Sequence, residues 1–393
     1  MLDGKTVILG VSGSIAAYKT AALASALKKQ HCDVHVIMTE NACQFITPLT
    51  FETLTGHRCI TDTFDRNFEF NVAHVSLAQA ADLIMIAPAT ANVIAKLAHG
   101  IADDMLTTTV LAARCPVLVS PAMNTAMYEN AVTRANLNTL ENYGFEIIEP
   151  ATGLLACNYE GKGKMPEPAV LQQHIEKHIA RYKDLSGSKV LVTAGPTMEP
   201  IDPVRYITNH SSGRMGFELA RACMLRGARV TLISGSTSLE PPLFVDLIRV
   251  GSAAEMYDAV IDNFDDADFV FKAAAVADYT PAAYHDDKIK KSGGEATIKL
   301  TRTRDILAEL GRRKRDDQFI CGFSMETKDL LQNSTAKLEA KNADMIVANN
   351  LKIKGAGFGT DTNVVTIITK DGCEELPTMS KFEVADAIID RAL

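Results

Sequence analysis

Two short apolar segments that end in glycine constrain the fold of this chain most. Residues 5–10 (KTVILG) and 189–195 (KVLVTAG) each lead through a loop into an Ala- and Leu-rich segment. A second apolar run then follows, at residues 33–38 in the first half and 229–234 in the second. A strand, a helix and a second strand joined by short links pair in parallel with a right-handed crossover. Each half is therefore predicted to begin a doubly wound α/β domain.

Further apolar runs predict the other strands of two mostly parallel sheets. They lie at residues 82–87, 116–120, 269–275, 319–323, 345–348 and 364–368. Continuous apolar runs suit strands that are covered on both faces. Residues 170–182 are predicted to form a helix that closes the first domain, and the polar segment 184–188 (DLSGS) marks a boundary. We therefore predict two domains, at residues 1–188 and 189–393.

Composition and charge argue against several classes of protein. Apolar residues make up 47% of the 393 residues and charged residues 22%, which is the balance of a soluble globular protein. A net charge of -8 argues against a general nucleic-acid surface. No apolar run approaches the roughly 18 residues of a membrane span, and the first apolar stretch breaks at glycines, unlike a signal peptide. The eight cysteines have no paired spacing, so we expect reduced thiols in the cytoplasm.

Three loops after predicted strands of the first half indicate a mononucleotide site. Their sequences are GVSGSI at residues 10–15, APATAN at 87–92 and SPAMN at 120–124. Ligands of open α/β sheets bind beyond the carboxyl ends of the strands, and small residues at a helix N-terminus favour phosphate. The full GxGxxG pattern and the acidic ribose partner of NAD are missing from the sequence. A mononucleotide therefore fits better than a dinucleotide, with a simple tight turn as the alternative for the first loop.

These loops, together with His74, resemble the flavin-containing cysteine decarboxylases. Residues 153–168 (GLLACNYEGKGKMPEP) resemble the substrate-recognition flap of the phosphopantothenoylcysteine decarboxylases. The resemblance implies a flavoprotein-like domain in which FMN contacts Gly13, Ser14, Ile15, Thr39, Ala87, Pro88, Ala89, Thr90 and Asn92. A flavin can hold a hydride taken from the thiol-bearing carbon of the substrate, so that a thioaldehyde serves as electron sink for loss of CO2.

The same resemblance implies substrate-handling side chains in the first half. His74 is the candidate base for thiol oxidation. Asn124, beside Met123, would orient the substrate carboxylate, and Cys157 would donate the proton that completes reduction of the enethiol. Each has a structural alternative: a packed histidine, an asparagine that caps the next helix and a small buried cysteine. Asn158 stands where the family more often has glycine.

Two pairs of basic side chains in the first half have no clear chemical role. Lys162 and Lys164 flank glycines of the flap, and they could equally contact a substrate phosphate or be solvated. His174 and His178 are four residues apart on the predicted closing helix, without the HExxH order of a zinc site. We expect this histidine pair to form an ordinary helix surface.

Residues 192–216 (VTAGPTMEPIDPVRYITNHSSGRMG) are the most specific segment of the chain. The turn at residues 209–214 concentrates hydrogen-bond donors at a helix N-terminus, which is an anion site. The segment resembles the phosphopantothenate–cysteine ligases, and this implies a Rossmann-like ligase domain. Met198 stands where that family usually has arginine, and Arg214 replaces a lysine, which keeps the charge but changes its geometry.

Other motifs extend this resemblance over nearly all of residues 189–393. They include KAAAVADY at residues 272–279, KIKK at 288–291 and FGTDTN at 358–363, while Arg304 replaces the usual proline. The resemblance implies that CTP activates the carboxylate as an acyl-cytidylate, which the amine of cysteine then attacks. Such a transfer needs mainly positioning and neutralisation of charge.

The resemblance assigns ligand contacts in the second half residue by residue. The cytidine nucleotide is expected against Lys272, Ala273, Ala274, Asp278, Lys288, Arg304, Asp305, Ile306, Leu307, Phe323, Lys337 and Lys341. The ligase substrate is expected against Asn209, Ser211, Ser212, Gly213 and Arg214. Lys288 is the candidate for the triphosphate, Asp278 for Mg2+ and Asn209 for stabilising the acyl intermediate, with a solvated loop as the alternative for Lys288. Lys337 and Lys341 should repel each other on one helix face, which a bound polyanion would relieve.

The two resemblances together imply a bifunctional enzyme of coenzyme A biosynthesis. Its ligase would join 4'-phosphopantothenate to cysteine, and its decarboxylase would convert the product to 4'-phosphopantetheine. We expect a cytoplasmic homo-oligomer that binds neither nucleic acid nor membrane. Two alternatives stay open: a two-domain nicotinamide dehydrogenase, which should carry a full GxGxxG, and a non-enzymatic flavin-binding regulatory protein, which need not keep Cys157 or Lys288.

Overall fold

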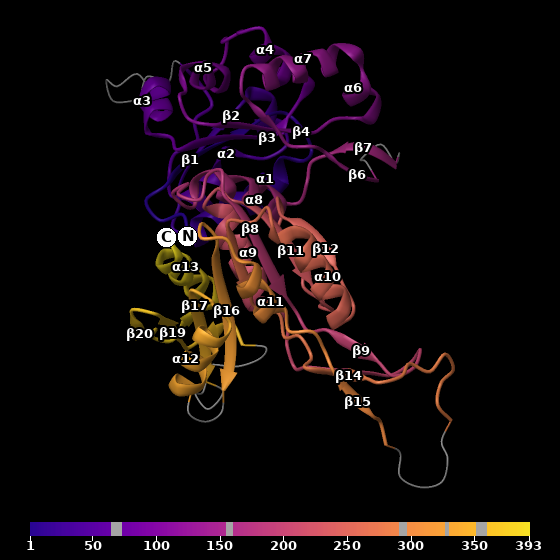
Figure 1. The fold of residues 1–393 in the computed structure, drawn as a ribbon. Coiled ribbons are helices and arrows are strands. Elements are labelled where there is room, and N and C mark those ends of the chain that lie inside the picture. Colours follow the sequence, from indigo (N-terminus) through magenta and orange to yellow (C-terminus); the bar gives the residue numbers. More distant parts are fainter. Residues whose placement is uncertain (64–72, 155–159, 291–296, 327–329, 351–359) are drawn as a thin grey trace. The chain divides into compact units, whose positions relative to one another are not determined.

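The computed structural model divides the chain into two compact units, Met1–Arg181 and Tyr182–Leu393 (Figure 1). It describes residues 1–63, 73–154, 160–290, 297–326, 330–350 and 360–393. The division between the units falls a few residues before the predicted boundary at residue 188. In the described ranges, no helix is both long and apolar enough to cross a membrane.

The first unit is built on a five-stranded parallel sheet with strand order β2-β1-β3-β4-β5. The strands are β1 (Thr6–Val11), β2 (Asp33–Met38), β3 (Leu83–Ala89), β4 (Val117–Pro121) and β5 (Glu146–Ile147). The helices are α1 (Ala17–Lys29), α2 (Pro48–Thr55), α3 (Ala73–Ala80), α4 (Ala91–Ala98), α5 (Met105–Ala112), α6 (Thr125–Glu129), α7 (Ala131–Asn142) and α8 (Pro168–Ile179). A short helix, η1 (Glu40–Gln44), follows β2. The predicted strands and parallel pairing are confirmed, and the closing helix begins and ends slightly earlier than predicted.

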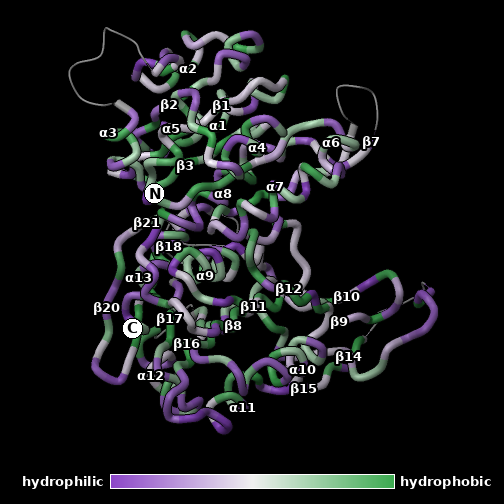
Figure 2. The backbone as a smooth tube through the Cα atoms, turned by 90° about the horizontal axis from the view of Figure 1, so that it is seen from above, coloured by the Kyte–Doolittle hydropathy of each residue, from purple (hydrophilic) through white to green (hydrophobic). Residues whose placement is uncertain are grey.

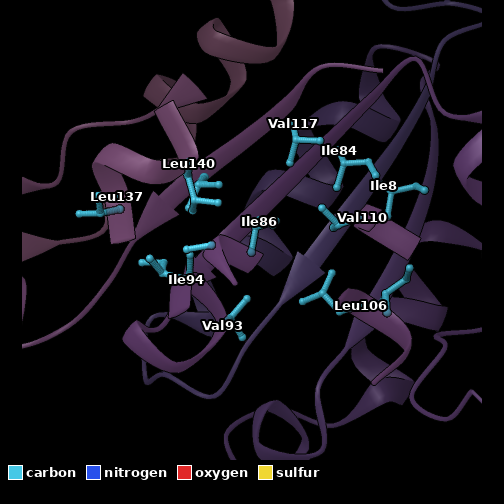
Figure 3. Packing of buried hydrophobic residues seen from close by; sticks show 14 of the residues in the cluster. Ile8, Ile84, Ile86, Val93, Ile94, Leu106, Val110, Val117, Leu137 and Leu140 are labelled. Carbon is cyan, nitrogen blue, oxygen red and sulfur yellow. The ribbon is translucent and has the colours of Figure 1, made fainter. Parts of the chain in front are cut away.

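The core of the first unit explains why the sequence forms this sheet. Every residue of β3 (LIMIAPA) is buried, as expected for a strand covered on both faces. On one face, Ile84 and Ile86 of β3 pack with Val93 of α4 and Leu106 of α5 (Figure 3). Helix α5 begins at a capping box in which Asp104 and Thr107 exchange hydrogen bonds. Packing of the helices on the faces of the sheet leaves the loops at the strand ends for function.

The second unit contains an eight-stranded sheet of order β12-β11-β8-β13-β16-β17-β19-β20. Its strands are β8 (Lys189–Ala194), β11 (Arg229–Ser234), β12 (Asp246–Arg249), β13 (Phe269–Lys272), β16 (Phe319–Glu326), β17 (Met345–Asn350), β19 (Val365–Thr369) and β20 (Gly372–Glu375). The first six pair in parallel, whereas β19 and β20 join antiparallel. The predicted strand at residues 364–368 is therefore buried but antiparallel, within a mostly parallel sheet.

The remaining elements of the second unit are five helices and three small ladders among the described residues. The helices are α9 (Arg214–Leu225), α10 (Ala253–Phe264), α11 (Ile306–Arg313), α12 (Leu330–Ala340) and α13 (Lys381–Ala392). The ladders pair β9 (Met198–Pro200) with β10 (Tyr206–Thr208), β14 (Tyr279–Pro281) with β15 (Leu300–Arg302), and β18 (Thr362–Asn363) with β21 (Met379–Ser380). Figure 2 shows hydrophobic residues concentrated along the sheet strands and hydrophilic residues mainly in the outer loops.

Candidate active sites

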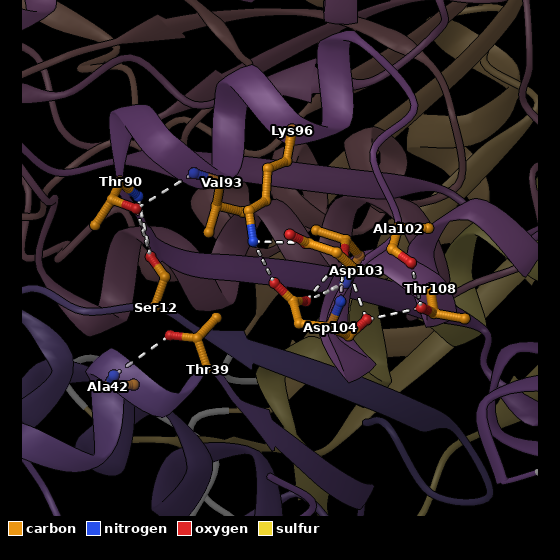
Figure 4. A network of polar contacts seen from close by, with 11 residues as sticks. Ser12, Thr39, Ala42, Thr90, Val93, Lys96, Ala102, Asp103, Asp104 and Thr108 are labelled. Atoms are coloured by element: carbon orange, nitrogen blue, oxygen red, sulfur yellow. Dashed lines mark hydrogen bonds and ion pairs between the residues drawn. The ribbon is translucent and has the colours of Figure 1, made fainter. Parts of the chain in front are cut away.

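Ser12 joins two of the predicted cofactor loops at the carboxyl ends of β1 and β3 in the first sheet. Its backbone N–H and its hydroxyl both donate to the carbonyl of Pro88, at 3.2 and 2.7 Å. The backbone N–H of Thr90 donates in turn to Ser12 Oγ at 3.0 Å, and Thr90 Oγ1 caps helix α4 by accepting from Val93 (Figure 4). The loops after β1 and β3 thus lie together, as predicted for a site beyond the carboxyl ends of these strands.

The glycine turn after β1 packs tightly against the segment that follows β2. A Cβ atom added to Gly13 would lie 2.6 Å from Asn41 Cβ, so only glycine fits there. Thr39 caps η1 by accepting from the Ala42 N–H at 3.3 Å, and Ser14 Oγ accepts from the Ala16 N–H at 3.3 Å. A hydroxyl that accepts a hydrogen bond can still donate one to a phosphate. Ile15, the residue after Ser14, is 58% exposed, as expected for an apolar contact of a planar ring.

The flap hairpin contacts the loop after β4. Strands β6 (Ala151–Leu154) and β7 (Glu160–Lys164) pair antiparallel, and the Met123 N–H donates to the Gly163 carbonyl at 3.0 Å. A Cβ atom on Gly163 would lie 2.3 Å from the Met123 carbonyl oxygen, and one on Gly161 would lie 2.3 Å from Thr125 Oγ1. The two flap glycines therefore permit β7 to lie directly on the PAMN loop.

The predicted substrate-handling residues of the first unit have different outcomes. Asn124 caps α6, because its Oδ1 accepts from the Ala126 N–H at 2.8 Å, so the structural alternative for this residue is present. His74 lies half-buried on α3. Cys157 and Asn158 lie outside the described residues. Lys162 forms an ion pair with Glu149. The catalytic roles of His74, Asn124 and Cys157 stay predictions.

The expectation that His174 and His178 form an ordinary helix surface is wrong. His174 Nδ1 lies 2.6 Å from Glu146 Oε1, and His178 Nε2 lies 2.7 Å from Glu146 Oε2. Hydrogen bonds from both rings hold the pKa of Glu146 well below its usual range. Glu176, between the histidines in sequence, is buried and accepts from Gln30 Nε2 at 2.7 Å. The acidic partner comes from β5, too far away in sequence for helical spacing to reveal it.

Two pockets of the second unit adjoin and contain most of the predicted ligand contacts. The pocket of 430 Å3 is lined by nine of the predicted nucleotide residues, namely Lys272, Asp278, Arg304, Asp305, Ile306, Leu307, Phe323, Lys337 and Lys341. The pocket of 560 Å3 is lined by all five predicted ligase-substrate residues, namely Asn209, Ser211, Ser212, Gly213 and Arg214. Two further predicted nucleotide contacts, Ala273 and Ala274, also line this pocket. Lys272, Asp278 and Lys337 line both pockets. The two pockets therefore share part of their walls.

In the 430 Å3 pocket, here called the nucleotide pocket, protein groups hold Lys337 and Lys341 and lower the pKa of Lys272. Burial, reinforced by the charge of Lys337, lowers the pKa of Lys272 to about 8. Lys341 Nζ donates to Asp305 Oδ2 at 2.8 Å, and Lys337 Nζ donates to the Phe323 carbonyl at 2.9 Å. Burial disfavours the Asp305 carboxylate, but hydrogen bonds from Lys341 and from the Ala308 N–H outweigh it and lower the pKa of Asp305. Relief of repulsion between Lys337 and Lys341 therefore does not require a bound polyanion.

The 560 Å3 pocket, here called the substrate pocket, has the predicted anion turn at its wall. Gly213 begins α9 in the left-handed conformation with φ 79°, and an added Cβ would lie 3.1 Å from the Gly195 backbone. Asn209 Nδ2 donates to the carbonyls of Ala275 and Val276, both at 3.2 Å. Asn209 thus ties the turn to the segment that lines both pockets, which is a positioning contact.

Two predicted nucleotide contacts are placed less simply. Lys288 is exposed and lines neither of the two pockets; the next residue is tied to Asp202, which accepts from the Ile289 N–H at 3.2 Å. Arg304 lines the nucleotide pocket, but its Nη2 donates to Asp258 at 2.7 Å and its guanidinium lies 3.8 Å from the centre of the Tyr257 ring. The described structure therefore does not bring Lys288 together with the other nucleotide residues.

The sequence interpretation missed a buried lysine in the substrate pocket. Lys381 is 5% exposed and lines this pocket with Asn349 and Asn363. Burial and the nearby Arg214 lower the pKa of Lys381. A signal was available, because a lysine in the first turn of a helix opposes the helix dipole and is usually unfavourable there. Its presence at the start of α13 fits a pocket that receives an anion.

Two family models together span almost the whole chain. The model described as Flavoprotein matches residues 1–180, and the model described as DNA/pantothenate metabolism flavoprotein C-terminal domain matches residues 185–393. These matches define the class: a flavoprotein unit followed by a pantothenate-metabolism unit on one chain.

Two relatives show the family more closely. The coenzyme A biosynthesis bifunctional protein CoaBC of Bacillus subtilis (strain 168) is 51% identical over 393 residues, which cover 99% of this chain and 97% of that protein. The CoaBC protein of Vibrio vulnificus (strain YJ016) is 45% identical over 390 residues, covering 99% and 97%. A crystal structure of the C-terminal domain of a CoaBC protein is 44% identical, with a TM-score of 0.46, and covers 53% of this chain and 95% of that one. The chain belongs to the CoaBC family of bifunctional coenzyme A biosynthesis proteins, which confirms the family resemblance and sets aside the dehydrogenase and regulatory alternatives.

Proposed function

We propose that residues 189–393 ligate 4'-phosphopantothenate to cysteine with CTP, and that residues 1–188 decarboxylate the product to 4'-phosphopantetheine with FMN. The observation that carries the ligase proposal is the pair of adjoining pockets with Lys272 in their common wall. CoaBC relatives cover both halves of the chain, which supports two activities on one polypeptide. The product of the second unit is then the substrate of the first.

In the proposed ligase reaction, the substrate carboxylate attacks the α-phosphorus of CTP and pyrophosphate leaves. The cytidine nucleotide occupies the nucleotide pocket, where Lys272, Lys337 and Lys341 neutralise its phosphates. The phosphate of phosphopantothenate occupies the substrate pocket, at the N-terminus of α9 and near Lys381. The amine of cysteine then displaces CMP from the acyl-cytidylate.

Mg2+ fits beside Asp278 in this arrangement. Asp278 is exposed and lines both pockets. Magnesium is commonly held by one or two carboxylates together with substrate phosphates and water. Asp278 would supply the protein oxygen, and the metal would balance charge on the triphosphate. Asn209 keeps the anion turn against residues 275–276, so we propose that it positions the acyl intermediate.

The loops of the first unit fit the phosphate and ring of FMN. Ser14, Thr39 and Thr90 provide hydroxyls, and Ile15 provides an exposed apolar contact. The flavin, when bound, supplies a reversible hydride acceptor. The neutral form of His74 would accept the substrate thiol proton, and Cys157 would return a proton to the enethiol. Asn124, held at the start of α6, would orient the carboxylate that is lost.

A nucleotide panel tests the ligase half. Purified protein is mixed with 4'-phosphopantothenate, cysteine, Mg2+ and each nucleoside triphosphate in turn, and pyrophosphate and phosphate are measured separately. We expect pyrophosphate, formed best with CTP. Release of phosphate with ATP would contradict the proposal, because it indicates an acyl-phosphate. We also propose that the protein is a homo-oligomer, and light scattering on the same protein tests this.

A second test addresses the decarboxylase half. The purified protein should show flavin absorbance, and it should release CO2 from 4'-phosphopantothenoylcysteine without a nucleotide. Protein that takes up no added FMN would overturn the proposal for the first unit while leaving the ligase half intact.

A further inference from the structure

Asp33, His35 and His57 form a compact cluster in the first unit. His57 Nε2 lies 2.6 Å from Asp33 Oδ1, and His35 Nε2 lies 3.0 Å from Asp33 Oδ2. The two imidazole rings stack with centroids 4.2 Å apart and an interplanar angle of 22°. One ligand atom from each residue lies within 4.8 Å of the other two. Two imidazoles and a carboxylate thus lie close enough together to hold one metal ion.

The cluster is built on regular elements of the fold. Asp33 and His35 are two residues apart on β2, so their side chains share one face of the strand. His57 follows α2, and the isolated bridge between Ile37 and Ile60 fixes this segment beside β2. The cluster is accessible from solvent, because the side chains of Asp33 and His57 are 45% and 39% exposed.

The proposed reactions do not use this cluster. Asp33 pairs with Thr6 at the start of β1, so it lies at the amino ends of the parallel strands. The loops proposed to bind FMN follow the carboxyl ends of β1 and β3 instead. The cluster and the candidate flavin site therefore lie at opposite ends of the parallel strands.

The charge states of the cluster suit a cation. Burial and the neighbouring charges of His57 and Lys28 lower the pKa of His35, against the opposing effect of Asp33. Burial disfavours ionisation of Asp33, but hydrogen bonds from both histidines outweigh it and lower the pKa of this carboxyl group. An ionised carboxylate and a neutral imidazole are the forms of these side chains that bind metals.

We propose that Asp33, His35 and His57 form a binding site for Zn2+. Imidazole nitrogen and carboxylate oxygen are ligands that zinc accepts in tetrahedral sites, with a fourth position for water. Each ring would bind through Nε2 and carry its proton on Nδ1, so that the cation replaces the two hydrogen bonds to Asp33. The ligand set excludes thiolates, and it favours Zn2+ over the harder Mg2+, which prefers oxygen ligands.

Zinc binding to the full-length, flavin-containing protein tests the proposal. The protein is stripped of metal with a chelator and dialysed against buffered ZnCl2, and bound zinc is measured by mass spectrometry of the elements. The His35→Gln and His57→Gln double variant is compared with the wild type. Glutamine keeps an N–H that can donate to Asp33. The matched control is the double variant His174→Gln and His178→Gln, which removes the other histidine pair that shares one carboxylate.

We expect the wild type and the His174/His178 control to bind one more zinc per chain than the His35/His57 variant. Each single substitution in the cluster should weaken binding by at least about tenfold. Equal zinc content in the wild type and the His35/His57 variant would overturn the proposal. Loss of the zinc only from the His174/His178 variant would also overturn it. If circular dichroism shows that the double variant has lost its fold, the two single variants His35→Gln and Asp33→Asn are compared with the wild type instead. Equal zinc content in the wild type and in both single variants would then overturn the proposal.

Discussion

Lys341 Nζ lies 2.8 Å from Oδ2 of Asp305, and this ion pair links the end of α12 to the start of α11 at the nucleotide pocket. The other oxygen of Asp305 accepts from the Ala308 N–H at 2.9 Å and caps α11. One carboxylate therefore both caps the N-terminus of α11 and orients a lysine that is proposed to contact CTP. In the proposed complex, the phosphates of CTP would compete with Asp305 for the ammonium group of Lys341, whose position is already defined by this ion pair.

Replacement of Asp305 by alanine should affect both stability and nucleotide binding. The lost cap should lower the free energy of unfolding by about 1 kcal/mol, and the released Lys341 should raise KM for CTP. The matched control is Asp104→Ala, which removes the cap of α5 in the first unit. That control should cost similar stability without a change in KM for CTP. An unchanged KM for CTP in Asp305→Ala would show that the ion pair between Asp305 and Lys341 does not contribute to nucleotide binding.

Lys272 should give the second unit a characteristic pH dependence. Its pKa is about 8 in the folded protein, against 10.5 for an ordinary lysine, so between these values the unfolded chain binds more protons. Stability contributed at this position therefore rises with pH between about 8 and 10.5. Lys272→Met should be more stable than the wild type at pH 7, and the difference should shrink toward pH 10. Chemical unfolding at several pH values measures it, and a constant difference would refute the lowered pKa.

Activity should show the opposite trend at the same lysine. As Lys272 loses its charge above pH 8 it neutralises phosphate less well, so KM for CTP should increase. Lys272→Arg stays charged throughout this range, and its KM for CTP should change less between pH 7 and 9. Identical pH profiles for the two proteins would exclude titration of Lys272 as the cause.

Gly163 should be essential for decarboxylation but not for ligation. An added Cβ would lie 2.3 Å from the Met123 carbonyl oxygen, and the φ of 142° disfavours other residues. Gly163→Ala should therefore displace the flap from the PAMN loop and reduce CO2 release from 4'-phosphopantothenoylcysteine. Gly144→Ala is the control, because Gly144 also has positive φ but no atom lies within 4 Å of its added Cβ. Similar loss of decarboxylation in both variants would indicate general backbone strain instead.

Lys381 should contribute to binding of the ligase substrate. We expect Lys381→Met to raise KM for 4'-phosphopantothenate about tenfold, the usual size of a lost hydrogen bond to a charged group, with little change in KM for CTP. Its stability at pH 7 should not fall, because burial already disfavours the charged lysine. Lys370→Met, at an exposed position of the same unit, should change neither KM. An unchanged KM for phosphopantothenate in Lys381→Met would remove Lys381 from the site.

The sequence predicted the sheets well because their strands are continuous apolar runs. Residues 269–275 and 345–348 were predicted as strands covered on both faces, and β13 (Phe269–Lys272) and β17 (Met345–Asn350) confirm both, although β13 ends three residues earlier than predicted. The direction of β19 was not predictable from its composition, since a buried antiparallel strand can be as apolar as a parallel one. The ladder of β9 with β10 was missed because its strands are only three residues long.

The candidate sites were predictable where a local motif carries them. The loop at residues 87–92 follows β3, the turn at 209–214 precedes α9, and Lys337 and Lys341 line the nucleotide pocket, as the motifs predict. Lys381 and the pairing of Glu146 with His174 and His178 depend on contacts between distant elements, which no local pattern encodes. Lys288 was assigned from the family resemblance of its KIKK motif; it lies on an exposed segment, and its role toward the triphosphate stays a prediction.

The coupled reaction tests the central claim most directly. The flavin-loaded protein is given 4'-phosphopantothenate, cysteine labelled at its carboxyl carbon, CTP and Mg2+, and products are identified by mass. We expect pyrophosphate, which requires only the second unit, together with labelled CO2 and 4'-phosphopantetheine, which require both units. Two results would contradict the proposed pair of activities. One is unconsumed 4'-phosphopantothenate with no pyrophosphate, and the other is accumulation of 4'-phosphopantothenoylcysteine that never loses its label.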